Sequence, residues 1–201
     1  MNSSAACLRH WLYDWGGLNA QLMLWVNRSG TAESIGIARV LSAIGSYWGA
    51  PITMLLLIFW QARLRTAVAA IAPFRFVTGL GTAMLVAAMA KAAFAYPRPA
   101  EVFGNQLPWV VGSPDSMYAF PSGHAVYTAV VLATCWSLAS WPWRVALLLL
   151  ALAIGWSRVA LGAHFPADVL AGFLLGLTSV AATRKPSEMT MHAFQRWLPW
   201  R

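Results

Sequence analysis

Three short polar clusters interrupt a chain that is otherwise strongly apolar. The clusters are Lys91 with Arg98-Pro99, then Pro121-Ser122-Gly123-His124, then Ser157-Arg158 with His164 and Asp168. Because charged and polar side chains are costly in or near a bilayer, such groups are functional-site candidates by default. Cations together with histidines and a carboxylate form a set of side chains that is suited to phosphoryl transfer.

His164 and Asp168 stand four positions apart, about one helical turn, and Pro166 between them favours the start of a helix. The two side chains are therefore expected on one face. A carboxylate that accepts a hydrogen bond from one imidazole nitrogen fixes the tautomer and makes the other nitrogen a better nucleophile. An H-x-x-x-D match alone has little specificity, so this interpretation depends on the other clusters.

Residues 121–124 are expected to form a turn that leads into a helix. Ser122 can cap that helix, and Gly123 allows the backbone to approach a ligand closely. Free N–H groups at a helix start bind phosphate oxygens, and His124 could then donate a proton to the leaving oxygen. The alternative is an ordinary capping turn at the membrane interface that contains a polar histidine.

Lys91, Arg98 and Arg158 could neutralise a phosphate dianion and the charge that develops in its transition state. Each cation also has a simpler interpretation: Lys91 as a snorkelling side chain, Arg98 as a loop cation and Arg158 as an interface anchor. Each simpler interpretation is reasonable for one cation alone. It is a weaker explanation for all three cations at once, because they occur together with both histidines. We therefore predict a single phosphate-binding site.

The composition is that of an integral membrane protein. Of 201 residues, 59% are hydrophobic and only 10% are charged, whereas soluble domains average about a quarter charged residues. We expect an all-α, polytopic helical bundle that forms a single membrane-embedded domain over 1–201, without a cleaved signal peptide. The net charge of +8 is not arranged as a basic stripe, so no nucleic-acid partner is expected. Cys7 and Cys135 do not suggest a disulfide framework.

Hydropathy predicts the helices that must position the clusters. A span needs roughly 20 residues, and the candidates are 36–60, 74–95, 123–140, 144–160 and 166–183. The second candidate is expected to begin just after Pro73. The segment 17–31 mixes apolar and polar residues, so it is either a short or tilted first span, which we favour, or a helix that lies in the interface. Residues 97–120 are rich in turn formers and predict an outer loop that covers the site or simply connects two spans.

Basic residues outside the three clusters indicate the orientation. They gather around the connections between spans and after the last one, at Arg63, Arg65, Arg75, Arg144, Arg184 and Lys185. The positive-inside rule places these residues in the cytoplasm and the three polar clusters on the opposite, outer face. In a bacterium, we expect an inner-membrane protein whose site faces the periplasm.

The clusters resemble the three signature motifs of the type 2 phosphatidic acid phosphatase superfamily. The motifs are Lys91-(six residues)-Arg98-Pro99, Pro121-Ser122-Gly123-His124 and Ser157-Arg158-(five residues)-His164-(three residues)-Asp168, and every signature position is present. The resemblance implies a bundle of about six transmembrane helices. It also implies that His164 attacks phosphorus to form a phosphohistidine, with Asp168 orienting it and His124 protonating the leaving group. The phosphoryl oxygens would be held by Lys91, Arg98, Ser122, Gly123 and Arg158.

Within this superfamily the short chain, with Leu18-Asn19 and Asn27 before the bundle, looks like the small bacterial undecaprenyl-diphosphate phosphatases. The resemblance implies a phosphorylated lipid substrate, a surrounding of membrane lipids, and no metal or other cofactor. Undecaprenyl diphosphate, from the lipid carrier of cell-wall synthesis, is the favoured substrate. Phosphatidylglycerophosphate, phosphatidate and lipid A phosphatases share the motifs, as do lipid phosphotransferases. A lipid transporter with a vestigial site is the alternative outside enzymes, and the oligomeric state stays open.

Overall fold

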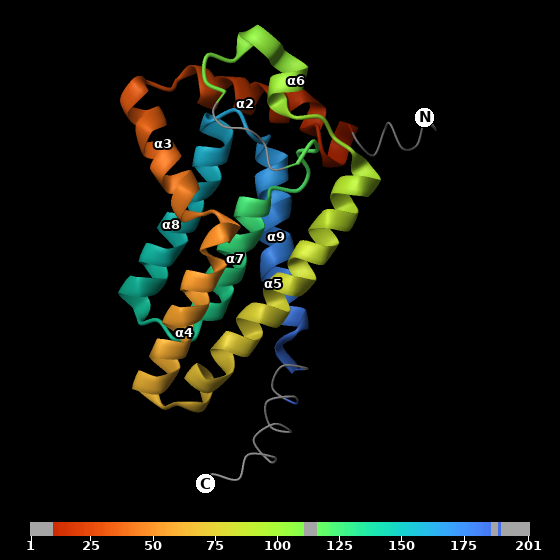
Figure 1. The fold of residues 1–201 in the computed structure, drawn as a ribbon. Helices are drawn as coiled ribbons and strands as arrows, with labels where there is room; N and C mark the ends of the chain where they lie inside the picture. The colour runs from red at the N-terminus through yellow and green to blue at the C-terminus, as the bar shows by residue number, and fades with distance from the viewer. Residues whose placement is uncertain (1–9, 111–115, 186–188, 190–201) are drawn as a thin grey trace.

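The computed structural model describes residues 10–110, 116–185 and 189, and in that part of the chain it contains helices and no strands (Figure 1). The α-helices are α2 (Leu18–Arg28), α3 (Ala32–Ile44), α4 (Ala50–Leu64), α5 (Ala67–Phe94), α6 (Pro99–Phe103), α7 (Gly123–Trp136), α8 (Trp141–Ala160) and α9 (Pro166–Ala182). Helix α7 contacts α5, α8 and α9 and lies at the centre of the bundle. The predicted all-α fold is confirmed.

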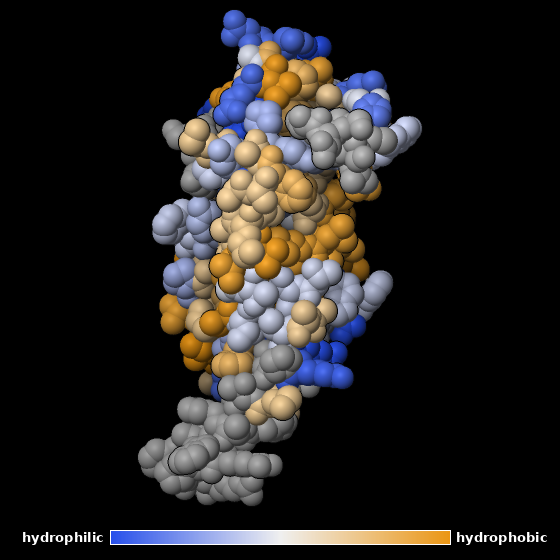
Figure 2. Space-filling model, turned by 90° about the vertical axis from the view of Figure 1, so that its right-hand side faces the viewer, coloured by the Kyte–Doolittle hydropathy of each residue, from blue (hydrophilic) through white to orange (hydrophobic). Residues whose placement is uncertain are grey.

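The long helices have the length and composition of membrane spans. In the described residues, Ala67–Gln106 and Trp141–Ala160 meet both criteria. If the bent pair Ala32–Ile44 and Tyr47–Leu64 is counted as one span, the described residues contain three candidate spans. Helices α7 and α9 are shorter and also apolar. Figure 2 shows hydrophobic residues gathered over the middle of the visible face and the most hydrophilic ones toward its two ends. The chain is therefore an integral membrane protein, while the number of six spans stays a prediction.

The helix predicted as continuous over 36–60 is broken, which corrects that prediction. Helix α3 ends before Gly45, and the chain bends by 44° between the two helices of the pair. Gly45 lies against α8, where an added Cβ would clash with the Ile154 side chain. Ser46 then caps a 3-10 turn at Tyr47–Gly49, and Pro51 stands in the first turn of α4. Proline is favoured there because the first helical N–H groups have no partner within the helix.

The start predicted just after Pro73 is also wrong, because α5 begins at Ala67 and contains that proline. The Thr66 hydroxyl accepts a hydrogen bond from the Ala69 N–H at 3.2 Å and caps the helix. Prolines are tolerated inside membrane helices, where neighbouring groups can satisfy the freed backbone. The C-terminal end of this helix is close to the predicted one: α5 ends at Phe94, and Lys91 lies in its last turn.

Helix α2 does not form the first span that the sequence favoured over 17–31. It has 11 residues and a length of about 16 Å, which is roughly half of the hydrocarbon thickness. In Figure 1 it lies across the end of the bundle, where it contacts α8 and α9. Its buried residues Asn19, Met23 and Asn27 recur every four positions and form the face toward these helices. The structure thus agrees with the interfacial alternative.

Close contact between α7 and α9 brings two of the polar clusters together. Added Cβ atoms at Gly172 and Gly176 would lie 2.7 Å from the Ser122 carbonyl and 2.6 Å from the Val126 carbonyl. Small residues allow two membrane helices to approach in this way. At the N-terminal ends of both helices, the Ser122 N–H donates to the Asp168 carbonyl at 3.0 Å. The start of α7 is therefore fixed beside the start of α9.

Candidate active site

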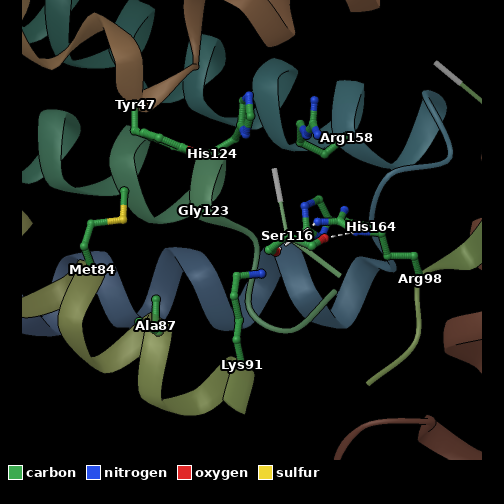
Figure 3. Close-up of a pocket in the computed structure, with 11 residues that line it drawn as sticks. Tyr47, Met84, Ala87, Lys91, Arg98, Ser116, Gly123, His124, Arg158 and His164 are labelled. Atoms are coloured by element: carbon green, nitrogen blue, oxygen red, sulfur yellow. Dashed lines mark hydrogen bonds between the residues drawn. The ribbon is translucent and has the colours of Figure 1, made fainter. Parts of the chain in front are cut away.

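A cavity of about 190 Å³ lies where α5, α7 and α8 approach the end of the bundle that carries α2 and α6 (Figures 1 and 3). Six of the eight predicted site residues line it: Lys91, Arg98, Gly123, His124, Arg158 and His164. The other two, Ser122 and Asp168, are fully buried behind this lining. The structure therefore brings all three polar clusters to one place.

His164 lies in the connection between α8 and α9, and Asp168 lies in the first turn of α9. The His164 Nδ1 is 3.5 Å from the Asp168 Oδ2, which is longer than a normal hydrogen bond, although such contacts often tighten when substrate binds. The same Oδ2 accepts a hydrogen bond from the Phe165 N–H at 2.8 Å. Because Nδ1 is directed to Asp168, Nε2 is the nitrogen that can act as a nucleophile.

The surroundings of His164 favour its neutral form. Burial lowers the pKa of this imidazole well below its ordinary value of 6.5, and the positive charges of Arg158, Arg98 and Lys91 lower the pKa further, while an interaction with the Ala119 backbone opposes them. The cations act in this direction because a second positive charge beside them is unfavourable. At neutral pH, His164 therefore has an unprotonated nitrogen available for attack.

Arg98 is held by hydrogen bonds to two neighbouring segments of the chain. Its Nε donates to the Ser116 carbonyl at 2.8 Å, its Nη1 to the Ala163 carbonyl at 2.9 Å and its Nη2 to the Ser116 hydroxyl at 3.2 Å. The guanidinium thereby joins the loop before α7 to the loop that carries His164. It is 7% exposed and lines the cavity.

The other two cations reach the cavity from opposite walls (Figure 3). Lys91, from α5, donates to the Tyr118 carbonyl at 2.8 Å. Arg158, from the last turn of α8, donates through Nη1 to the Ser42 hydroxyl of α3. These two acceptors are neutral oxygens, a backbone carbonyl and a hydroxyl. An anion in the cavity would lie between the two cations.

The start of α7 differs in one detail from the prediction. Ser122 occupies the N-cap position, but its side chain makes no capping hydrogen bond, and its buried Oγ has no hydrogen-bond partner among the described residues. The backbone fixes this turn instead, through the Ser122 N–H bond to Asp168 described above. His124, in the first turn of α7, is 8% exposed and packs edge-on against the Tyr47 ring, with 6.1 Å between ring centroids. Both rings line the cavity.

The inner wall of the cavity is apolar. Met84, Ala87 and Ala88 of α5 line it, one to two helical turns before Lys91. This spacing places them on the same face as Lys91. Ala88 is also exposed. The cavity thus combines a cationic end with an apolar wall.

Sequence reasoning missed several residues that build the site. Tyr47 and Ser116 line the cavity, Ser42 binds Arg158, and the Tyr13 hydroxyl donates to the Asp168 Oδ1 at 2.8 Å. No local spacing connects these residues with the three clusters. Ser42 and Tyr47 lay in the span predicted over 36–60, and Ser116 lay in the loop predicted over 97–120, of which residues 111–115 lie outside the described part.

Comparisons with known proteins show which sequences and folds the chain resembles. The sequence pattern of the PAP2 superfamily matches residues 72–190. The chain is 32% identical over 162 residues to a Sulfolobus acidocaldarius protein named undecaprenyl-diphosphatase, covering 80% of this chain and 74% of the relative. It is 35% identical over 86 residues to the Escherichia coli putative undecaprenyl-diphosphatase YbjG, covering 41% of this chain and 42% of that protein.

Two solved structures share the fold. The first is Aquifex aeolicus LpxE, with a TM-score of 0.70 at 20% identity, covering 84% of this chain and 95% of that one. The second is a PAP2-type phosphatidylglycerolphosphate phosphatase from Bacillus subtilis, with a TM-score of 0.70 at 19% identity, covering 98% and 93%. The fold of a membrane phosphatase therefore extends over almost the whole chain.

Proposed function

Because the chain belongs to the PAP2 superfamily, we propose that it hydrolyses undecaprenyl diphosphate to undecaprenyl phosphate and phosphate through a phosphohistidine on His164. The observation that carries this proposal is the convergence of two imidazoles and three cations in one cavity with an apolar wall. The substrate follows from the relatives named undecaprenyl-diphosphatase and from the mixed character of the cavity wall.

In the first step, the lone pair of the His164 Nε2 forms a bond to the terminal phosphorus, and the bridging P–O bond breaks. The bridging electrons stay on the leaving oxygen, which belongs to undecaprenyl phosphate, and protonated His124 donates its proton to that oxygen. Lys91, Arg98 and Arg158 stabilise the negative charge on the remaining phosphoryl oxygens. Asp168 stabilises the positive charge that develops on the His164 ring.

In the second step, a water molecule attacks the phosphorus of the phosphohistidine, and neutral His124 accepts a proton from it. The P–N bond breaks and its electrons return to His164. Phosphate leaves, and both histidines are restored to their starting protonation states. The site residues and water thus complete the cycle without a metal ion in any step.

The orientation of the site is part of the proposal. Arg63, Arg65 and Arg144 lie around the α4–α5 and α7–α8 connections, at the end of the bundle opposite the cavity (Figure 1). Arg184 and Lys185 follow the end of α9 at that same end. By the positive-inside rule this end faces the cytoplasm. The cavity then faces the periplasm or exterior of a bacterial inner membrane.

The test is phosphate release by the purified protein from undecaprenyl diphosphate, phosphatidylglycerophosphate, phosphatidate and lipid A. We expect the highest kcat/KM with undecaprenyl diphosphate, unchanged rates in EDTA, and no turnover by a folded His164→Ala variant. Preference for another lipid would reassign the substrate. Transfer of the phosphoryl group to a second lipid in place of water would make the protein a phosphotransferase.

A further inference from the structure

The N-terminal segment before α2 contacts Asp168, the partner of His164 in the site. The Tyr13 hydroxyl donates to the Asp168 Oδ1 at 2.8 Å, although the two residues are 155 positions apart in the chain. Tyr13 is 7% exposed and Asp168 is fully buried. Tyr13 also lies outside residues 72–190, which the superfamily pattern matches. Nothing in the three motifs accounts for this contact.

The contact occupies the carboxylate oxygen that His164 does not use. Oδ2 faces the His164 Nδ1 and accepts from the Phe165 N–H, whereas Oδ1 accepts from Tyr13. A carboxylate held by donors on both oxygens cannot rotate about its Cβ–Cγ bond without losing one of them. The Tyr13 hydrogen bond therefore keeps Oδ2 directed at the imidazole.

Tyr13 is itself held in place by an aromatic cluster. Its ring centroid lies 4.2 Å from that of Tyr96, 5.6 Å from that of Phe120 and 6.2 Å from that of Phe165. These rings come from the chain after α5, the turn before α7 and the turn before α9. Such contacts fix the tyrosine ring, so the direction of its O–H is set before substrate binds.

A second hydrogen bond joins the N-terminal part of the chain to the start of α9. The buried Asn19 side chain of α2 accepts from the Ala167 N–H at 3.0 Å, in the first turn of α9. The segment 13–19 thus contacts the start of α9 at two adjacent residues, one through its backbone and one through its carboxylate. The Asn19 hydrogen bond holds the N-terminal segment in place, so that Tyr13 stays beside Asp168.

We propose that Tyr13 is a positioning residue for the phosphoryl-transfer reaction, which acts through Asp168 to hold His164 in the orientation for attack. The inference rests on the proposed function. It differs from a purely structural role in that Tyr13 affects the chemical step and leaves the binding of phosphate by the three cations unchanged.

The test compares Tyr13→Phe with Tyr96→Phe in the full chain. The first variant removes the hydroxyl on Asp168 and keeps the ring, while the second removes a hydroxyl from the ring beside it and keeps the Tyr13 hydrogen bond. Removing an outer partner that orients a metal-bound histidine typically costs about 10- to 100-fold, and we expect a loss on the same scale for this metal-free histidine pair. We expect kcat to fall by about tenfold or more in Tyr13→Phe, with KM and the inhibition constant of inorganic phosphate within about twofold of wild type.

A double-mutant cycle separates positioning from general stability. In an Asp168→Ala background, Tyr13→Phe should cause no further loss of kcat, because the group on which Tyr13 acts is gone. Additive losses would overturn the inference, as would an unchanged kcat or an equal loss in Tyr96→Phe. Loss of phosphate binding or of the thermal unfolding transition in Tyr13→Phe would assign a structural role instead. Absence of phosphate release by the wild-type protein would refute the proposed function itself.

Discussion

Substitution of Arg158 by Met should reduce catalysis and shift its pH dependence in a defined direction. Arg158 lines the cavity, and after burial its charge contributes most to the lowered pKa of His164. Removing one donor to the charge that develops in the transition state costs about 100- to 1000-fold in kcat. Removing a positive charge beside an imidazole also raises its pKa.

The sign of the shift follows from the form of His164 that reacts. Attack requires the neutral imidazole, so activity falls on the acid side as His164 becomes protonated. In the wild-type protein the pKa of His164 lies well below 6.5, so this loss occurs at low pH. In Arg158→Met the pKa of His164 is higher, and the acid limb of the profile should move toward neutral pH.

The assay is kcat/KM for phosphate release measured from acid to alkaline pH in detergent micelles. Arg144→Met is the matched control, because Arg144 lies at the opposite end of α8, where its Nε donates to the Trp136 carbonyl at 2.9 Å. Titration of the substrate itself contributes equally to all three proteins. An acid limb that stays fixed or moves to lower pH in Arg158→Met would refute the electrostatic account of His164.

Three further predictions concern His124 as the general acid, the access of lipid substrates to the cavity, and the contribution of Asn27 to stability. His124→Ala should reduce kcat most for substrates with poor leaving groups, and equal losses across a series of leaving groups would contradict its role as the general acid. Ala88→Trp at the cavity edge should lower kcat/KM about tenfold for long-chain lipids and little for a water-soluble short-chain diphosphate. The control Ala93→Trp, at an exposed position of the same helix outside the cavity lining, should affect neither. Asn27→Leu removes the donor to the Trp109 carbonyl at 2.7 Å and the Ala160 carbonyl at 2.8 Å. It should lower the free energy of unfolding by about 1–3 kcal/mol, measured by thermal unfolding against Gln21→Leu on the exposed side of α2.

Much of the site could be predicted because helix ends leave strong signals in the sequence. Pro166 stands at the start of α9, and Ser122-Gly123 at the start of α7, as predicted. The apolar runs predict which helix ends lie at the same face of the membrane. The polar clusters at those helix ends were therefore expected to meet. The cavity lined by six of the predicted residues agrees with that expectation.

The contacts that orient the site residues could not be predicted in the same way. Tyr13 reaches Asp168 across 155 positions, and Ser42 reaches Arg158 across 116. Hydropathy and spacing report whether a residue is buried and on which face, and they do not report its partner. A tyrosine or serine near a membrane edge therefore gives no sign of which distant side chain it binds.

Two of the three helix errors, the continuous helix over 36–60 and the first span over 17–31, have the same origin. The break at Gly45 is set by its contact with Ile154 of α8, a tertiary constraint that an apolar run does not reveal. Helix α2 carries Asn19 and Asn27 toward the bundle, where both form hydrogen bonds with other parts of the chain. In the sequence, such buried amides have the same polarity as exposed ones. The choice between a tilted span and an interfacial helix thus depended on partners that only the fold supplies.

The most direct measurement is the identification of the covalent intermediate. Purified protein is mixed with a lipid diphosphate labelled at its terminal phosphate, quenched in alkali within the first turnover, and digested for mass spectrometry. The mechanism predicts an acid-labile phosphoryl group on the imidazole of His164, absent from His164→Ala and longer-lived in His124→Ala. Phosphate attached to another residue, or full phosphate release without any labelled protein in rapid-quench experiments, would contradict it.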